Sequence, residues 1–175
     1  MKRWLSFLLA LVIFFTVHEG AHAFVAALFG EYEAFHVRPI GLEVTFKTPV
    51  DERTGPRWAL ISGTSNVLTL VMRYELLLLA GRFARSTSVF LKASIYYLTL
   101  LSLLLDPLNL SIGPFIYGGD ADGIAVGLGI SRYLVQAVFF LVLVANRELV
   151  AQRLVPAYGV KTTHLLLKPW MRFTC

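Results

Sequence analysis

The chain has 175 residues, of which 57% are hydrophobic and 15% charged, compared with roughly 45–50% and 25% in an average soluble domain. This composition argues against a soluble globular protein. The formal net charge of +5 indicates basic flanks of membrane spans and not nucleic-acid binding, because no basic stretch is interleaved with aromatic residues. The single cysteine, Cys175, excludes an internal disulfide and a cysteine-based metal site. Any metal must therefore be held by His, Asp or Glu.

The first apolar segment, residues 4–29, is predicted to span the membrane, and Gly30 with the acidic residues after it ends the segment. The same stretch also has the form of a secretory signal peptide, because Met1-Lys2-Arg3 precedes it and Ala21-His22-Ala23 matches an A-x-A cleavage site. A His-Glu pair close before a cleavage site is unusual. The remaining chain would also still cross the membrane several times, so an uncleaved span is the preferred interpretation.

A small β-hairpin is predicted at about residues 34–47. Leu42, Val44 and Phe46 alternate with polar residues, which is typical of a half-buried strand. The extended segment before them is joined through Pro39-Ile40-Gly41, which suits a tight turn.

Three further spans are predicted at about residues 58–80, 87–105 and 131–150. The second contains SGTSN at 62–66, whose small residues allow close helix packing. Asp106-Pro107 is predicted to end the third span, and Ser131 to cap the fourth. Residues 1–175 are therefore expected to form a single membrane-embedded domain. Its expected fold class is an all-α polytopic membrane protein with about four transmembrane helices and a membrane-associated β-hairpin.

Residues 18–22 read HEGAH and match the pattern H-E-x-x-H. On a helix the two histidines lie on one face about 6 Å apart along the axis, so both can bind one Zn²⁺ while Glu19 reaches a water on the metal. Burying these groups in a span is costly without a metal or a polar cavity. The alternative is that His18 and Glu19 mark the interfacial end of the span. His36, in the predicted hairpin, and His164, in the basic tail, are poorly placed to join the site.

Asp120 and Asp122, in the segment GGDADG, are candidates for the third protein ligand that a catalytic zinc usually takes. They directly precede the last span, and counting spans puts them on the same membrane face as His18 and His22. The alternative is an acidic turn in water. The spacing alone leaves the choice between the two aspartates open.

With these features the chain resembles the site-2 protease family of intramembrane zinc metalloproteases over most of its length. HEGAH corresponds to that family's His-Glu-x-x-His, and residues 28–46 to its membrane-associated strand segment. SGTSN, ending in Asn66, occupies the place of its Gly-x-x-x-Asn-like element, and residues 106–123 are similar to its late Asn-x-x-Pro…Asp-Gly motif. The proline usual in the second element is absent and the spacing of the late motif is altered. No PDZ-like insertion is present, which implies a minimal core form.

The resemblance implies a zinc metalloendopeptidase that hydrolyses peptide bonds in or near transmembrane segments of other proteins. Zn²⁺ would be its cofactor and Glu19 its general base. Asn66 could bind the substrate backbone, and the alternative is that it makes a polar contact between packed helices. The Asp-Gly order of the family favours Asp122 as the third ligand, and the altered spacing keeps Asp120 open. The expected partners are a transmembrane protein substrate and the lipid bilayer, with no nucleic acid.

Two other functions share the same residues: a zinc-binding but inactive membrane scaffold and a small metal carrier. Glu19 is unnecessary for zinc binding alone, and a carrier would show more polar residues along several spans. The protein is expected to be a multi-pass protein of the cell membrane. The distribution of Lys and Arg favours cytoplasmic termini and a metal site near the outer face, whereas family members generally place the metal nearer the cytosol.

Overall fold

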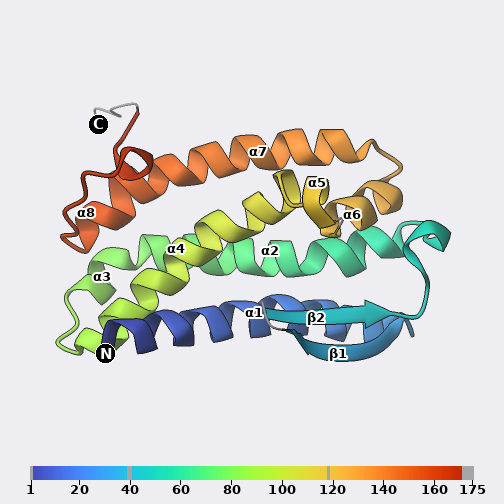
Figure 1. Cartoon of the computed structure of the whole chain (residues 1–175), viewed down its shortest axis with the longest axis horizontal. Coiled ribbons are helices and arrows are strands. Elements are labelled where there is room, and N and C mark those ends of the chain that lie inside the picture. Colours follow the sequence, from blue (N-terminus) through green and yellow to red (C-terminus); the bar gives the residue numbers. More distant parts are fainter. Residues whose placement is uncertain (1, 39–40, 118, 171–175) are drawn as a thin grey trace.

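The computed structural model describes residues 2–38, 41–117 and 119–170. Its long helices run lengthwise beside one another (Figure 1): α1 (Lys2–Leu28), α2 (Arg57–Leu78), α4 (Val89–Ser111) and α7 (Arg132–Leu149). Shorter elements connect or extend them: a 3-10 turn (Val50–Glu52), α3 (Ala80–Ala84), α5 (Pro114–Tyr117), α6 (Asp120–Leu128), a π-helical turn (Val150–Leu154), α8 (Val155–Ala157) and a 3-10 turn (Leu165–Leu167). The fold is thus mainly helical.

Within the described part of the chain, three helical segments are long and apolar enough to cross a membrane: Arg3–Leu28, Val89–Ser111 and Arg132–Ala157. The span predicted at 58–80 is not among them, although α2 covers that region with 22 residues. The buried face of α2 is rich in polar side chains, including Ser62, Ser65, Asn66, Thr69 and Arg73, and these lower its hydropathy. Four spans are therefore not confirmed, and α2 instead packs against α1, α4 and α6.

The hairpin is confirmed as a small antiparallel sheet of β1 (Tyr32–Arg38) and β2 (Gly41–Phe46), paired from Arg38 opposite Gly41 to Tyr32 opposite Phe46. Residues 39 and 40 of the predicted turn lie outside the described residues. β2 packs against α1, and Val44 is buried there. The predicted cap is confirmed too, because Ser131 Oγ accepts a hydrogen bond from the backbone N–H of Tyr133 at 3.3 Å.

The prediction that Asp106-Pro107 ends the third span is wrong, because α4 continues to Ser111 with Pro107 inside it. Proline lacks the N–H that would bond the carbonyl of Leu103 one turn earlier. Asn146 on α7 replaces that donor, since its Nδ2 donates to the Leu103 carbonyl at 2.8 Å. The neighbouring helix thus lets α4 continue through the proline.

Helix α6 packs closely on α2 through two glycines four residues apart. A Cβ added to Gly123 would lie 1.9 Å from Ser62 Oγ, and one added to Gly127 would lie 2.1 Å from the backbone nitrogen of Ala59. Only glycine permits this approach of the two backbones. The contact fixes the rotation of α6 and places Asp120, at its start, beside α2.

Candidate metal centre

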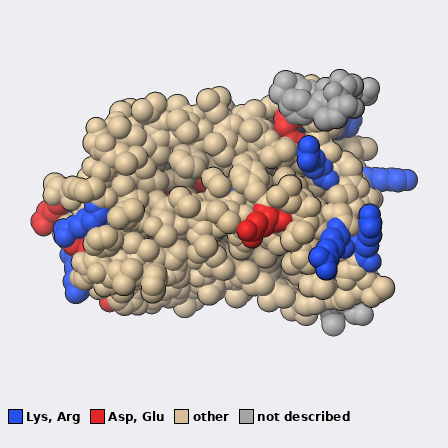
Figure 2. Space-filling model, turned by 180° about the vertical axis from the view of Figure 1, so that it is seen from behind, with Lys and Arg blue, Asp and Glu red and all other residues tan. Residues whose placement is uncertain are grey.

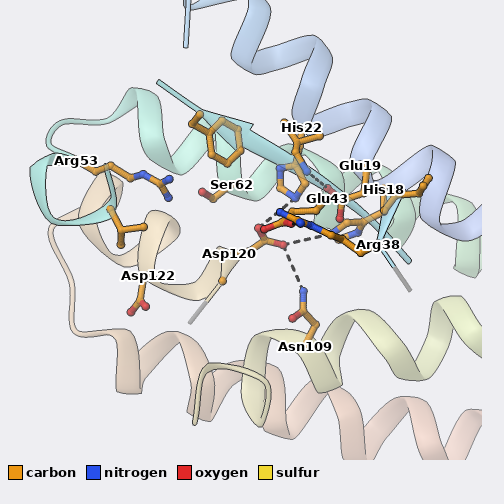
Figure 3. Close-up of a pocket in the computed structure, with 15 residues that line it drawn as sticks. His18, Glu19, His22, Arg38, Glu43, Arg53, Ser62, Asn109, Asp120 and Asp122 are labelled. Carbon is orange, nitrogen blue, oxygen red and sulfur yellow. Dashed lines mark hydrogen bonds and ion pairs between the residues drawn. The ribbon is translucent and has the colours of Figure 1, made fainter. Parts of the chain in front are cut away.

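His18 and His22 lie one turn apart on α1 and point toward Asp120 at the start of α6 (Figure 3). His22 Nε2 is 3.1 Å from Asp120 Oδ1, and His18 Nε2 is 3.3 Å from Asp120 Oδ2. Ligands at about 2.0–2.2 Å from a tetrahedral metal are about 3.3–3.6 Å from each other. The two distances to Asp120 are close to this spacing, and the ligand atoms of all three residues lie within 4.8 Å of one another, so they form a group that could hold a metal ion.

An oxygen atom lies close to the other ring nitrogen, Nδ1, of each histidine. His18 Nδ1 lies 3.2 Å from Asp106 Oδ1, and His22 Nδ1 lies 2.7 Å from the carbonyl oxygen of Ile61. A proton on Nδ1 of His22 fits its contact with Ile61, whereas His18 Nδ1 and Asp106 Oδ1 lie close together without hydrogen-bond geometry. Both Nε2 atoms lie on the side of Asp120. Metal-binding histidines commonly have this arrangement, in which an outer oxygen orients the ring. The donor set and its surroundings therefore fit a metal.

Asp106 was not expected at the site, since the sequence indicated only a helix end there. It is fully buried, and its second oxygen, Oδ2, is 3.8 Å from Arg73 Nη1. Arg73, also fully buried, donates through Nη1 to the Ser102 carbonyl at 3.1 Å. Ionisable residues within apolar helical segments usually mark functional sites, and that signal could have identified Asp106 and Arg73.

The structure brings Asp120, and not Asp122, to the two histidines. Asp122 instead lies 3.6 Å from Arg132 Nη1 and faces away from them (Figure 3). Two residues along a helix are about 200° apart around its axis, so both aspartates cannot face α1. The preference for Asp122 that the family order suggested does not match this geometry.

Asn66 on α2 forms a hydrogen bond with Asp120. Its Nδ2 donates to Asp120 Oδ2 at 3.1 Å and to the Ser62 carbonyl at 3.0 Å, and the residue is only 3% exposed. Its amide nitrogen is thus engaged in orienting a candidate ligand, and its binding to a substrate backbone stays a prediction. Ser65, also absent from the sequence-based site, places its Oγ 2.8 Å from His22 Nε2.

Glu19 borders a polar cavity of about 450 Å³, lined also by the three candidate ligands. Glu19 Oε2 accepts a hydrogen bond from the backbone N–H of Val44 on β2 at 3.2 Å. A second cavity of about 500 Å³ shares Glu19 and His18 and is walled by apolar side chains of α1, β2 and α4, namely Phe14, Phe15, Leu42, Leu105 and Leu108. The Glu19 carboxylate therefore lies between a polar and an apolar space.

Arg53 is a cation on the wall of the polar cavity. Its guanidinium lies 5.0 Å from the ring centre of Phe46 and 4.5 Å from that of Trp58. Partial burial lowers the pKa of Arg53, and the charges of nearby carboxylates, including Asp120 and Asp122, oppose that shift. Arginine remains charged under all such conditions, so Arg53 contributes positive charge beside the site.

The remaining histidines lie elsewhere. His36 Nε2 contacts Thr45 Oγ1 at 3.3 Å within the hairpin, and His164 lies in the tail beyond α8. Among the described residues, one group of three or more metal-binding side chains converges: His18, His22 and Asp120. Comparisons of the chain with protein-family models, curated proteins and solved structures find no match.

Proposed function

We propose that this protein is an intramembrane zinc metalloprotease that hydrolyses peptide bonds in or near transmembrane segments of other proteins. His18, His22 and Asp120 are the proposed metal ligands. The proposal rests on one observation above all: the ligand atoms of these three side chains lie within 4.8 Å of one another, and Glu19 lines the same cavity. Three helices apolar enough to cross a membrane support an intramembrane location.

In the proposed reaction Glu19 acts as general base and then as general acid. A bound zinc ion would supply a Lewis acid that lowers the pKa of water and polarises the scissile carbonyl. Glu19 accepts a proton from the attacking water and transfers it to the amine of the leaving peptide. The Val44 N–H, which contacts Glu19 Oε2, holds the carboxylate at the cavity for this step.

The edge of β2 that is not paired with β1 is the proposed place for the substrate backbone. The N–H of Val44 points to Glu19 and so marks the side of β2 that borders the site. A helical substrate must unwind locally before its carbonyl groups are accessible, and an extended peptide can pair with an exposed strand edge. The apolar cavity between α1 and α4 suits the side chains of a transmembrane segment.

The test uses purified protein in lipid nanodiscs, measured for zinc content and for cleavage of a panel of membrane-spanning peptides. Glu19→Gln should keep its zinc and lower the cleavage rate by about 10²–10⁴-fold. Glu33→Gln is the matched control, because it removes the same charge from an exposed position on β1. Cleavage at the wild-type rate by zinc-loaded Glu19→Gln would refute the mechanism. A zinc-loaded wild type that cleaves none of the peptides would favour an inactive scaffold.

A further inference from the structure

The end of the bundle farthest from the hairpin holds a basic cavity. The start of α1, the start of α4 and the segment after α8 line it, at the end of the bundle where the N-terminus lies (Figure 1). Lys and Arg side chains gather at this end of the surface, and others lie among Asp and Glu at the opposite end (Figure 2). The cavity measures about 570 Å³, and its lining includes Arg3, Lys92 and Lys161 and no carboxylate from the described chain. None of these cations is in an ion pair with a described carboxylate, so their charge is not balanced within the described structure.

Two tyrosines from different segments form part of the wall of this basic cavity. The rings of Tyr96 and Tyr158 pack edge to face with centres 5.2 Å apart. The hydroxyl of Tyr158 is buried and has no hydrogen-bond partner within the described residues. Burial raises the pKa of Tyr158 to about 12, so the hydroxyl stays protonated and is a donor at neutral pH.

An aromatic groove adjoins the basic cavity. It measures about 410 Å³ and is lined by Arg3, Trp4, Phe7 and Tyr97, of which Arg3 and Tyr97 also line the basic cavity. Phe7 and Tyr97 pack edge to face at 5.4 Å, and Trp4 is 73% exposed. Both spaces lie where two apolar helices, α1 and α4, begin. Cationic and apolar surfaces are thus continuous at one level of the bundle.

We propose that the basic cavity and the aromatic groove together bind one anionic phospholipid. The phosphate of its headgroup lies among Arg3, Lys92 and Lys161, and an acyl chain runs along Trp4 and Phe7. Basic pockets between transmembrane helices have the charge that anionic headgroups require. The groove assigns the phosphate to a lipid, because a free phosphate ion would use the basic cavity alone. This site lies away from the metal centre and does not depend on the proposed protease activity.

The experiment measures lipid binding to purified, delipidated protein in a neutral detergent by native mass spectrometry and by thermal unfolding. Three probes are compared: phosphatidylglycerol, phosphatidylcholine with the same acyl chains, and glycerol phosphate. The wild type should retain one phosphatidylglycerol, at least about tenfold more tightly than either other probe. Each cation near an anionic headgroup contributes about fivefold, so the triple variant R3Q/K92Q/K161Q should bind about 100-fold more weakly.

The matched control is R82Q/R85Q/R153Q, which removes three exposed arginines that line neither space. It should bind phosphatidylglycerol like the wild type. Both triple variants should unfold at the wild-type temperature without lipid and keep the wild-type zinc content, which separates this test from that of the metal centre. Equal loss in both variants, unchanged binding by R3Q/K92Q/K161Q, or equal affinity for phosphatidylcholine would overturn the proposal. Glycerol phosphate binding as tightly as the lipid would replace it with a phosphate site.

Discussion

Two clusters of buried charge in this protein are satisfied in different ways. On α7, Arg147 forms an ion pair with Glu148 and donates through Nη2 to the Leu165 carbonyl at 2.9 Å. Glu148 Oε1 accepts the Trp170 N–H at 3.0 Å, and its Oε2 accepts from Gln152 Nε2 at 2.7 Å. The charged groups of this cluster thus have hydrogen-bond partners within the chain. These hydrogen bonds hold the segment after α8 against α7.

At the candidate metal centre, nitrogen and oxygen acceptors lie close together, and the hydroxyl of Ser65 and the amide of Asn66 are donors beside them. The Nε2 atoms of His18 and His22 lie 3.3 and 3.1 Å from the carboxylate oxygens of Asp120. Such lone pairs attract one another only through a cation between them, either a proton or a metal ion. The comparison indicates that an ion pair with hydrogen-bond partners inside the protein stabilises the fold. Several buried acceptors close together, in contrast, favour the binding of a cation.

The largest effect is expected from removing the charge of the shared carboxylate. Asp120→Asn should weaken zinc binding by well over the roughly 10–100-fold that the loss of an outer partner causes, because a direct ligand is lost. Asp122→Asn, two residues away and beside Arg132, should keep its zinc. Metal content after dialysis against a chelator measures both. The reverse result would assign the ligand to Asp122, and full retention in both would place the third ligand elsewhere.

Breaking the ion pair of Arg147 and Glu148 is expected to lower the stability of the fold strongly without loss of metal. Arg147→Gln leaves the buried Glu148 without its cationic partner and removes the hydrogen bond to the Leu165 carbonyl, so the melting temperature should fall by about 10 °C. Thermal unfolding in detergent gives that value, and zinc content should stay at the wild-type level. Arg153→Gln, at an exposed position nearby, is the control. A fall in zinc content of Arg147→Gln would show that the two clusters are coupled.

An intermediate effect is expected at Asp106, which contacts a candidate ligand and does not itself face the metal. Asp106→Asn should lower zinc affinity by about 10–100-fold through the loss of the charge beside His18 Nδ1. Competition with a coloured chelator measures the affinity. Unchanged affinity would mean that Asp106 serves only to pair with Arg73.

The smallest effect is expected from the ion pair of Arg38 and Glu43 on the hairpin. These side chains are 56% and 49% exposed, and solvent screens such pairs. Glu43→Gln should therefore change the free energy of unfolding by less than about 1 kcal/mol. Chemical denaturation in detergent tests this value. A larger change would show that exposed charge in the hairpin supports the fold.

Local features of the candidate site were predictable from the sequence, because they depend on spacing along one element. His18 and His22 share a face of α1 since they are four residues apart, and the alternation of Leu42, Val44 and Phe46 predicted β2. The hydrogen bond at Ser131 follows from its position directly before a helix.

Features that depend on contacts between helices were not predictable in the same way. The choice of Asp120 over Asp122 depends on the rotation of α6, which Gly123 and Gly127 fix against α2. Asp106 reaches His18 because α4 packs beside α1. Similarly, the polar residues of α2 are buried because α2 packs against α1, α4 and α6. The sequence of α2 alone does not show that packing.

The proline in α4 has a consequence for the biogenesis of the protein. While the ribosome is still synthesising α7, the Leu103 carbonyl lacks the side chain of Asn146 that bonds it in the finished fold. A buried carbonyl left without a donor is costly, so the last turns of α4 gain stability when α7 packs beside them. Asn146 is itself held by the hydroxyl of Tyr74 on α2 at 2.7 Å. Asn146 therefore links α2, α4 and α7, and a chain truncated before Asn146 should be cleaved within α4 by added protease more readily than the full chain.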